Sequence, residues 1–165
     1  MKLEQFNGAG RSEAIATLRP CIDVTRWCEH LADRRPYGSI DELVAEAGTA
    51  ASPFTADEVE QALSHHPRIG ERASGASTEA SLSRSEQAGV DPADAEIARA
   101  LAEGNAAYEQ RFGRVFLIRA AGRSAGEILD ALTARLGNDD ATEDAVVAEE
   151  LREIAVLRLK GAIAA

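Results

Sequence analysis

One β-like run constrains the fold of this chain more than any other feature. Residues 115–118, with the sequence VFLI, have no second such run to pair with among the 165 residues, and an unpaired strand leaves its backbone groups without partners. Alanine supplies much of the 45% hydrophobic content, while aromatic residues make up only 4%. Alanine favours helix, whereas strands favour β-branched and aromatic residues. The sequence therefore predicts an all-α fold with residues 115–120 as one buried extended segment.

Helical periodicity and capping signals divide the chain into about seven or eight helices. Pro20 separates two helices within residues 13–34. Ser39 and Thr55 each precede a glutamate by three positions, the spacing of a capping box. Further helices are predicted over residues 92–112, with Pro92 in the first turn, and over residues 125–138, with Ser124 as the N-cap. A last helix is predicted from Thr142 onward. The length suits one domain, residues 1–165.

The net charge of −10 excludes function classes that need a basic face, so we expect neither nucleic acid nor membrane as a partner. No apolar run is long enough to span a bilayer, and the N-terminus lacks the apolar region of a secretory signal. Cys21 and Cys28 are expected to be reduced thiols in the core. These features together favour a cytoplasmic protein.

Two of the three histidines stand together in HHPRIGE, residues 65–71. Pro67 pushes the preceding residue out of the α region, which places His66 at the end of a helix. A helix C-terminus favours the protonated imidazole, and histidine titrates near neutral pH. The pattern fits a catalytic histidine, but on its own it favours an ordinary polar helix end.

A second polar group lies about twenty residues further on. Ser83, Glu86 and Gln87 occupy positions i, i+3 and i+4, so they share one helical face. A hydroxyl, a carboxylate and an amide on one face make a hydrogen-bonding wall for a small polar molecule. The same spacing between Ser83 and Glu86 also fits an ordinary capping box.

The extended segment at 115–120 offers a third set of groups. Its backbone N–H and C=O groups need partners, which an amide-rich ligand can supply. Arg119 and Arg123 flank its end, where they can bind a carboxylate or pair with surface acids.

Asn105 is a further anomaly, because it falls on the apolar face of the 92–112 helix. No HExxH, paired CxxC or glycine-rich phosphate loop is present, so no metal site is predicted.

Taken in order, several motifs resemble the 2-oxo-4-hydroxy-4-carboxy-5-ureidoimidazoline (OHCU) decarboxylase family over roughly residues 18–160. They are HPRIGE, SRSEQAG, NAAYEQRFG, FLIRAAGRS, RLGN and EIAVLRL. The family performs the last step of urate oxidation to (S)-allantoin. Arg114 departs from the family pattern, which usually has an apolar residue there.

The resemblance implies a metal-free and cofactor-free homodimer that acts on a small ureidoimidazoline. His66 would be the catalytic histidine and Glu86 its partner. The residues that would bind the substrate are Pro67, Ser83, Arg84, Ser85, Glu86, Gln87, Phe116, Leu117, Ile118, Arg119, Ala120 and Arg123.

Two other functions stay open on the sequence. One is a metal-dependent hydrolase of ureides that uses His65, His66 and acidic residues. The other is a helical interaction module without enzymatic activity, which predicts no convergent polar pocket.

Overall fold

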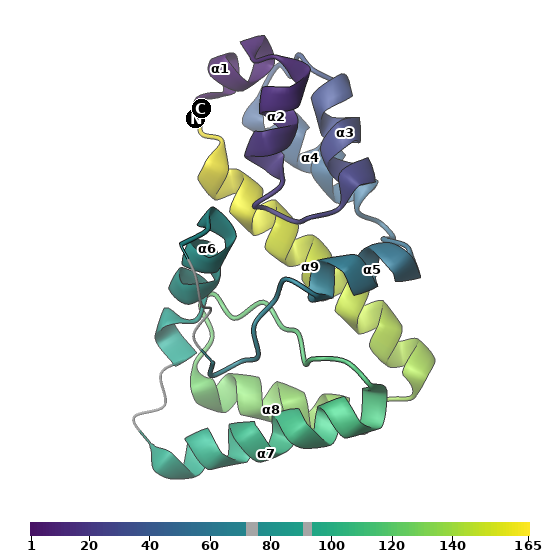
Figure 1. Cartoon of the computed structure of the whole chain (residues 1–165), viewed down its shortest axis with the longest axis vertical. Helices are drawn as coiled ribbons and strands as arrows, with labels where there is room; N and C mark the ends of the chain where they lie inside the picture. The colour runs from purple at the N-terminus through teal and green to yellow at the C-terminus, as the bar shows by residue number, and fades with distance from the viewer. Residues whose placement is uncertain (72–75, 91–93) are drawn as a thin grey trace. The chain divides into compact units, whose positions relative to one another are not determined.

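A computed structural model describes residues 1–71, 76–90 and 94–165 and confirms the all-α prediction (Figure 1). Within these residues there are nine α-helices, one short 3-10 helix and no strand beyond an isolated bridge between Lys2 and Ala164. The count exceeds the predicted seven or eight because α1 has no clear sequence signal. The elements are α1 Leu3–Gly8, α2 Arg11–Leu18, α3 Thr25–Asp33, α4 Ile40–Ala50, α5 Ala56–Leu63, α6 Thr78–Glu86, η1 Ala88–Val90, α7 Ala95–Phe112, α8 Ala125–Arg135 and α9 Asp140–Ala162.

The contacts divide the described chain into two compact units. Unit 1 comprises Met1–Ala62 and Leu151–Ala165, and unit 2 comprises Leu63–Glu150. The expectation of one domain over residues 1–165 stays a prediction. All the predicted site residues belong to unit 2.

Unit 1 is built on α2, α3 and α4, which pack in sequence order (Figure 1). Trp27 is fully buried between them, and its Nε1 donates to the Ala47 carbonyl oxygen at 2.9 Å. Cys21 and Cys28 are buried free thiols, and burial raises the pKa of each to about 12. Both are therefore unpaired cysteines of the core, as predicted.

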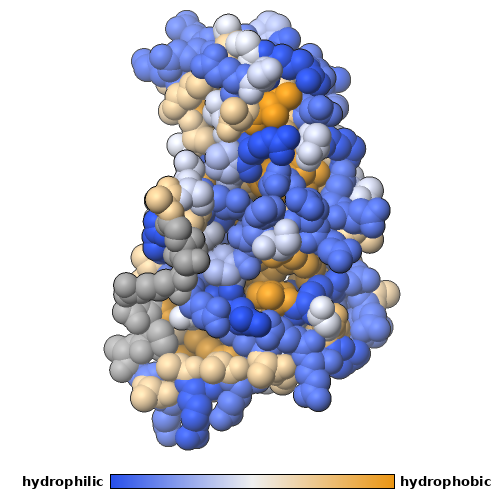
Figure 2. All heavy atoms as spheres, viewed as in Figure 1, coloured by the Kyte–Doolittle hydropathy of each residue, from blue (hydrophilic) through white to orange (hydrophobic). Residues whose placement is uncertain are grey.

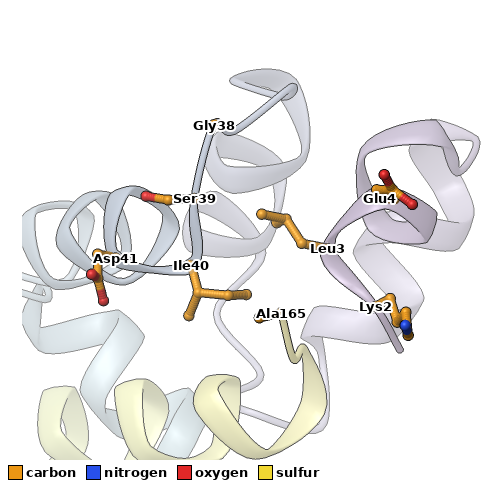
Figure 3. A pocket seen from close by; sticks show the side chains of 8 residues that line it. All are labelled: Lys2, Leu3, Glu4, Gly38, Ser39, Ile40, Asp41 and Ala165. Carbon is orange, nitrogen blue, oxygen red and sulfur yellow. The ribbon is translucent and has the colours of Figure 1, made fainter.

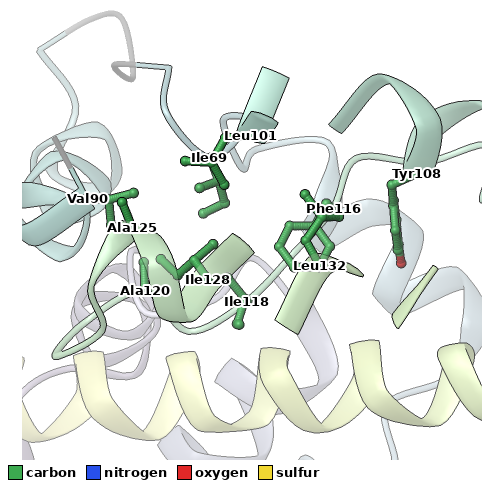
Figure 4. Packing of buried hydrophobic residues seen from close by; sticks show 10 residues of the cluster. All are labelled: Ile69, Val90, Leu101, Tyr108, Phe116, Ile118, Ala120, Ala125, Ile128 and Leu132. Atoms are coloured by element: carbon green, nitrogen blue, oxygen red, sulfur yellow. The ribbon is translucent and has the colours of Figure 1, made fainter. Parts of the chain in front are cut away.

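Unit 2 has a hydrophobic core built from the loop after α5, η1, α7, the extended segment and α8 (Figure 4). Helices α7 and α8 lie side by side and supply about half of it. Gly104 permits this approach, because a Cβ there would lie 2.5 Å from Leu132 Cδ2. The cluster consists of Ile69, Val90, Leu101, Tyr108, Phe116, Ile118, Ala120, Ala125, Ile128 and Leu132.

Three capping predictions are confirmed. Ser39 Oγ accepts from Glu42 N, Thr55 forms a reciprocal box with Glu58, and Ser124 caps α8.

Other helix boundaries differ from the prediction. Helix α9 begins at Asp140 rather than near Thr142, because Asp139 Oδ1 caps it by accepting from Thr142 N at 2.7 Å. Helix α7 begins at Ala95, after the cap Asp94. The predicted first-turn role of Pro92 lies outside the described residues.

Hydrophilic residues dominate the face seen in Figure 2, and hydrophobic ones show only in separate patches. Within the described ranges, none of the helices combines the length and apolar character needed to cross a bilayer.

Candidate active site

His66 lies on the turn that follows α5. The helix ends at Leu63, earlier than the stop predicted at Pro67, and His66 N donates to the Leu63 carbonyl oxygen at 3.1 Å. The two neighbouring histidines differ in their exposure to solvent. His65 is exposed, whereas His66 is half-buried and its Nε2 atom is buried. Pro67 beside it is also half-buried.

Ser83 and Glu86 lie in the second half of α6, and Gln87 is its C-cap. Ser83 is buried, Glu86 and Gln87 are half-buried, and the intervening Arg84 and Ser85 are exposed. The capping-box interpretation of Ser83 and Glu86 is wrong, because α6 starts at Thr78. Its cap is Ser77, whose Oγ accepts from Ala80 N at 3.1 Å. Ser83 is therefore an interior residue, and Glu86 is the last residue of the helix.

Two hydrogen bonds and an ion pair connect the loop after His66 to α6 and α7. Gly70 N donates to Gln87 Oε1 at 3.1 Å, which ties the loop to the end of α6. Asn105 Nδ2 donates to the Ile69 carbonyl oxygen at 2.9 Å, which ties the loop to α7. Arg68 Nε pairs with Glu109 Oε1 at 2.7 Å on the same helix. Asn105, the anomaly in the sequence, is thus a buried clamp on the histidine loop.

The buried extended segment at 115–120 is confirmed. Four of its side chains are buried, namely Phe116, Leu117, Ile118 and Ala120. The arginines at its end are half-buried and bind backbone carbonyl oxygens: Arg119 Nη1 donates to Ala121 at 3.0 Å, and Arg123 Nε donates to Arg119 at 3.0 Å.

The hydrophobic core brings the three predicted segments together within unit 2 (Figure 4). Ile69 lies three residues after His66, Val90 lies four residues after Glu86, and Ile118 belongs to the extended segment; all three share one cluster. A Cβ at Gly89 would lie 3.4 Å from the Arg123 carbonyl oxygen, so η1 runs close to the end of that segment. Ile69 and Ile118, 49 residues apart in sequence, thus belong to a common core.

The structure accommodates Arg114, which departs from the family pattern. It is half-buried, and its Nη2 pairs with Asp144 Oδ1 at 2.7 Å. An ion pair therefore occupies the position where the family usually has an apolar side chain.

None of the predicted site residues lines either of two cavities. One, of about 710 Å³, is in unit 1 between the start of α1 and the start of α4 (Figure 3) and contains none of the predicted site residues. The other, of about 300 Å³, lies in unit 2 between the 68–71 loop and α7, where Asn105 lines it. No group of three histidine, cysteine or acidic residues suited to a metal ion occurs in the described ranges.

The described residues form an all-α protein in which the loop after His66, the turn after Glu86 and a buried extended segment share one hydrophobic core. The family model of OHCU decarboxylase matches residues 7–160, and the chain belongs to that family. Its members are decarboxylases.

Related proteins agree with this assignment. The OHCU decarboxylase of Amia calva is 31% identical over 171 residues, which cover 99% of this chain and 95% of that protein. A crystal structure of OHCU decarboxylase in the presence of (S)-allantoin has a TM-score of 0.66 at 26% identity, over 86% of this chain and 92% of that one. An (S)-allantoin synthase structure shares the fold, with a TM-score of 0.74 at 17% identity, over 99% of this chain and 54% of that one.

Proposed function

We propose that this chain decarboxylates OHCU to (S)-allantoin, the last step of urate oxidation. The observation that carries the proposal is that the His66 loop, the η1 turn that follows Glu86 and the extended segment share one core. Family membership gives the reaction class, and this convergence gives the groups that would perform it.

The substrate supplies its own electron sink. A carboxylate and a hydroxyl share one ring carbon, and the adjacent ring carbon carries the ureido arm and a C=N bond. When the bond to CO₂ breaks, its electron pair forms a C=C bond, and the C=N pair moves to the nitrogen, which takes a proton. The resulting enol loses its hydroxyl proton to become a carbonyl, while the ureido-bearing carbon gains a proton on one face. The chemistry therefore needs no pyridoxal-type cofactor.

His66 would hydrogen-bond the hydroxyl and carboxylate and take part in the proton transfer. Its half-buried position supports this role, because a partly desolvated imidazole beside a bound substrate can exchange a proton with limited competition from water. One well-placed acid–base group contributes about 10²–10⁴-fold to the rate. Glu86, also half-buried, would accept hydrogen bonds from the ring or ureido N–H groups.

The remaining groups would recognise the ureido arm. Gln87 Oε1 already accepts from Gly70 N, so its amide nitrogen is the part that can donate to a substrate carbonyl. Ser83 would add a hydroxyl from the same face. Ile118 forms no backbone hydrogen bond with any residue that the structure describes, which suits the Phe116–Ala120 backbone to bind an amide-like ligand.

The family resemblance and the acidic charge support a cytoplasmic homodimer that works without metal or cofactor and binds neither nucleic acid nor membrane. Light scattering should give twice the chain mass. Activity should persist after dialysis against a chelator. Loss of activity that added zinc restores would instead support the metal-dependent hydrolase.

The decisive experiment generates the substrate in situ from urate with the two preceding enzymes and follows allantoin by circular dichroism. Adding this protein should accelerate the appearance of the (S)-allantoin signal over the spontaneous decay, which gives a racemic product. An unchanged rate and a racemic product would reject the proposed function.

A further inference from the structure

We propose that Arg135 and Glu150 are positioning residues that fix the backbone on either side of Ile118, so that the peptide groups of Ile118 face the substrate in one defined orientation. This inference rests on the proposed function, because the role it assigns is in binding the proposed substrate. Neither residue belongs to the predicted site.

Arg135, at the end of α8, reaches the segment from one side. Its Nη1 donates to the Leu117 carbonyl oxygen at 2.7 Å, and its Cζ lies 4.5 Å from the centroid of the Phe116 ring. The residue is only 7% exposed. One guanidinium therefore holds both a backbone oxygen and an aromatic ring of the same short segment, through the planar face and forked donors that distinguish arginine from lysine.

A buried network fixes the direction of that guanidinium. Its Nε and Nη2 donate to Glu143 Oε1 at 2.9 and 2.5 Å, and Glu143 is fully buried. The same carboxylate accepts from Tyr108 Oη at 2.5 Å and from Asn138 Nδ2 at 3.0 Å. Because two of its nitrogens are committed to Glu143, the third is aimed at Leu117.

Glu150, on α9, reaches the segment two residues further on. Its Oε2 accepts from Arg119 N at 2.7 Å. Leu117 and Arg119 are thus each held by a charged side chain from a different helix, while Ile118 between them has no backbone hydrogen bond to another described residue.

Stability alone is a poor explanation for this arrangement. Desolvating a buried ion pair costs several kcal/mol per ion, and well-packed apolar residues often replace such pairs without loss of stability. A fixed charge that ends on a specific carbonyl oxygen instead controls where a backbone lies. A displacement of about 1 Å in a substrate-holding group can cost about 10²-fold in activity.

The test uses Arg135→Lys and Glu150→Ala, with KM and the enantiomeric excess of allantoin as readouts. Lysine keeps the charge beside Glu143 but loses the fork and the flat face on Phe116. Alanine at 150 removes the acceptor for Arg119 N. For both variants we expect KM to rise about 10-fold to 100-fold and the (S) excess to fall, while the far-ultraviolet spectrum is unchanged. Glu150→Gln, which keeps an acceptor oxygen, should restore most of the loss.

The matched control is Arg111→Lys, since Arg111 also pairs with an acid, Asp140, but lies on the exposed face of α7. It should leave KM and enantiomeric excess unchanged. A purely structural role predicts lower thermal stability and less active protein, with normal KM and enantiomeric excess in what remains active. That result in either variant overturns the inference; if Arg135→Lys fails to fold, the two Glu150 variants decide. A wild-type protein that makes no (S)-allantoin would reject the proposed function instead.

Discussion

Gly70 and Gln87 are joined by a hydrogen bond of 3.1 Å from the glycine amide to the glutamine Oε1. The bond links the loop that follows His66 to the residue that follows Glu86. Gly70 has a φ of +88°, a backbone conformation that glycine adopts at little cost. The two proposed catalytic groups therefore extend from segments that share a direct polar connection.

His66→Ala is expected to lower kcat about 10²–10⁴-fold and to abolish the (S) preference, because the proton-transferring group is removed while the fold persists. The in situ urate assay with circular dichroism measures both effects. His65→Ala is the matched control: this exposed neighbour should retain the wild-type rate and chirality. Wild-type rate and chirality in His66→Ala would remove His66 from the mechanism.

Asn105→Ala should weaken the hold of α7 on the histidine loop. The Ile69 carbonyl oxygen loses its donor, so the free energy of unfolding should fall by about 1–3 kcal/mol, and kcat should fall as His66 gains freedom. Urea unfolding and the allantoin assay give the two quantities. Ala107→Ser, a substitution at an exposed position of the same helix, is the control variant. If kcat in Asn105→Ala matches that of the control variant, the loop does not depend on this clamp.

Glu143 should make stability depend on acid pH. Burial raises the pKa of its carboxyl, but hydrogen bonds from Arg135, Tyr108 and Asn138 outweigh this, so the net pKa is lowered. A carboxyl whose folded pKa lies below its unfolded value of about 4.3 stabilises the fold above that pH. The stabilisation is lost as the pH falls through the folded pKa.

Glu143→Gln tests this expectation through urea unfolding at several pH values. Breaking the buried pair should cost about 3–5 kcal/mol at pH 7, and the difference from wild type should shrink as the pH is lowered below 4. A difference that stays constant with pH would show that Glu143 contributes packing rather than charge.

Gly104→Ala should destabilise unit 2, because the new Cβ would lie 2.5 Å from Cδ2 of the fully buried Leu132. Overpacking of this kind costs about 1–3 kcal/mol, which thermal unfolding can measure. Gly126→Ala in α8 is the control, since its nearest contact is Ser124 Oγ at 3.9 Å. There alanine should be neutral or stabilising through its helix propensity. Equal stability of the two variants would contradict the close packing of α7 on α8.

Local patterns predicted what local chemistry determines. The caps at Ser39, Thr55 and Ser124 depend on side chains within three residues. The run at 115–118 was predicted to be buried because it is apolar and has no strand to pair with. The cap at Ser77 was missed because residues 70–80 show little periodicity and no glutamate or glutamine stands three positions after the serine.

Long-range contacts were beyond local reasoning. Nothing near Asn105 in sequence indicates that it binds the Ile69 carbonyl, and nothing near Arg135 indicates Leu117. The sequence did mark Asn105 as polar on an apolar face, which is a usable signal for a buried clamp. Arg135 gave none, because an arginine in the last turn of a helix normally interacts with the helix end.

Because Ile69, Val90 and Ile118 share one core, a substitution in the interior would also affect the three segments of the proposed site. A change in side-chain volume at any of these positions shifts the spacing among the histidine loop, the end of α6 and the extended backbone. We therefore expect substitutions at these positions to occur in compensating sets.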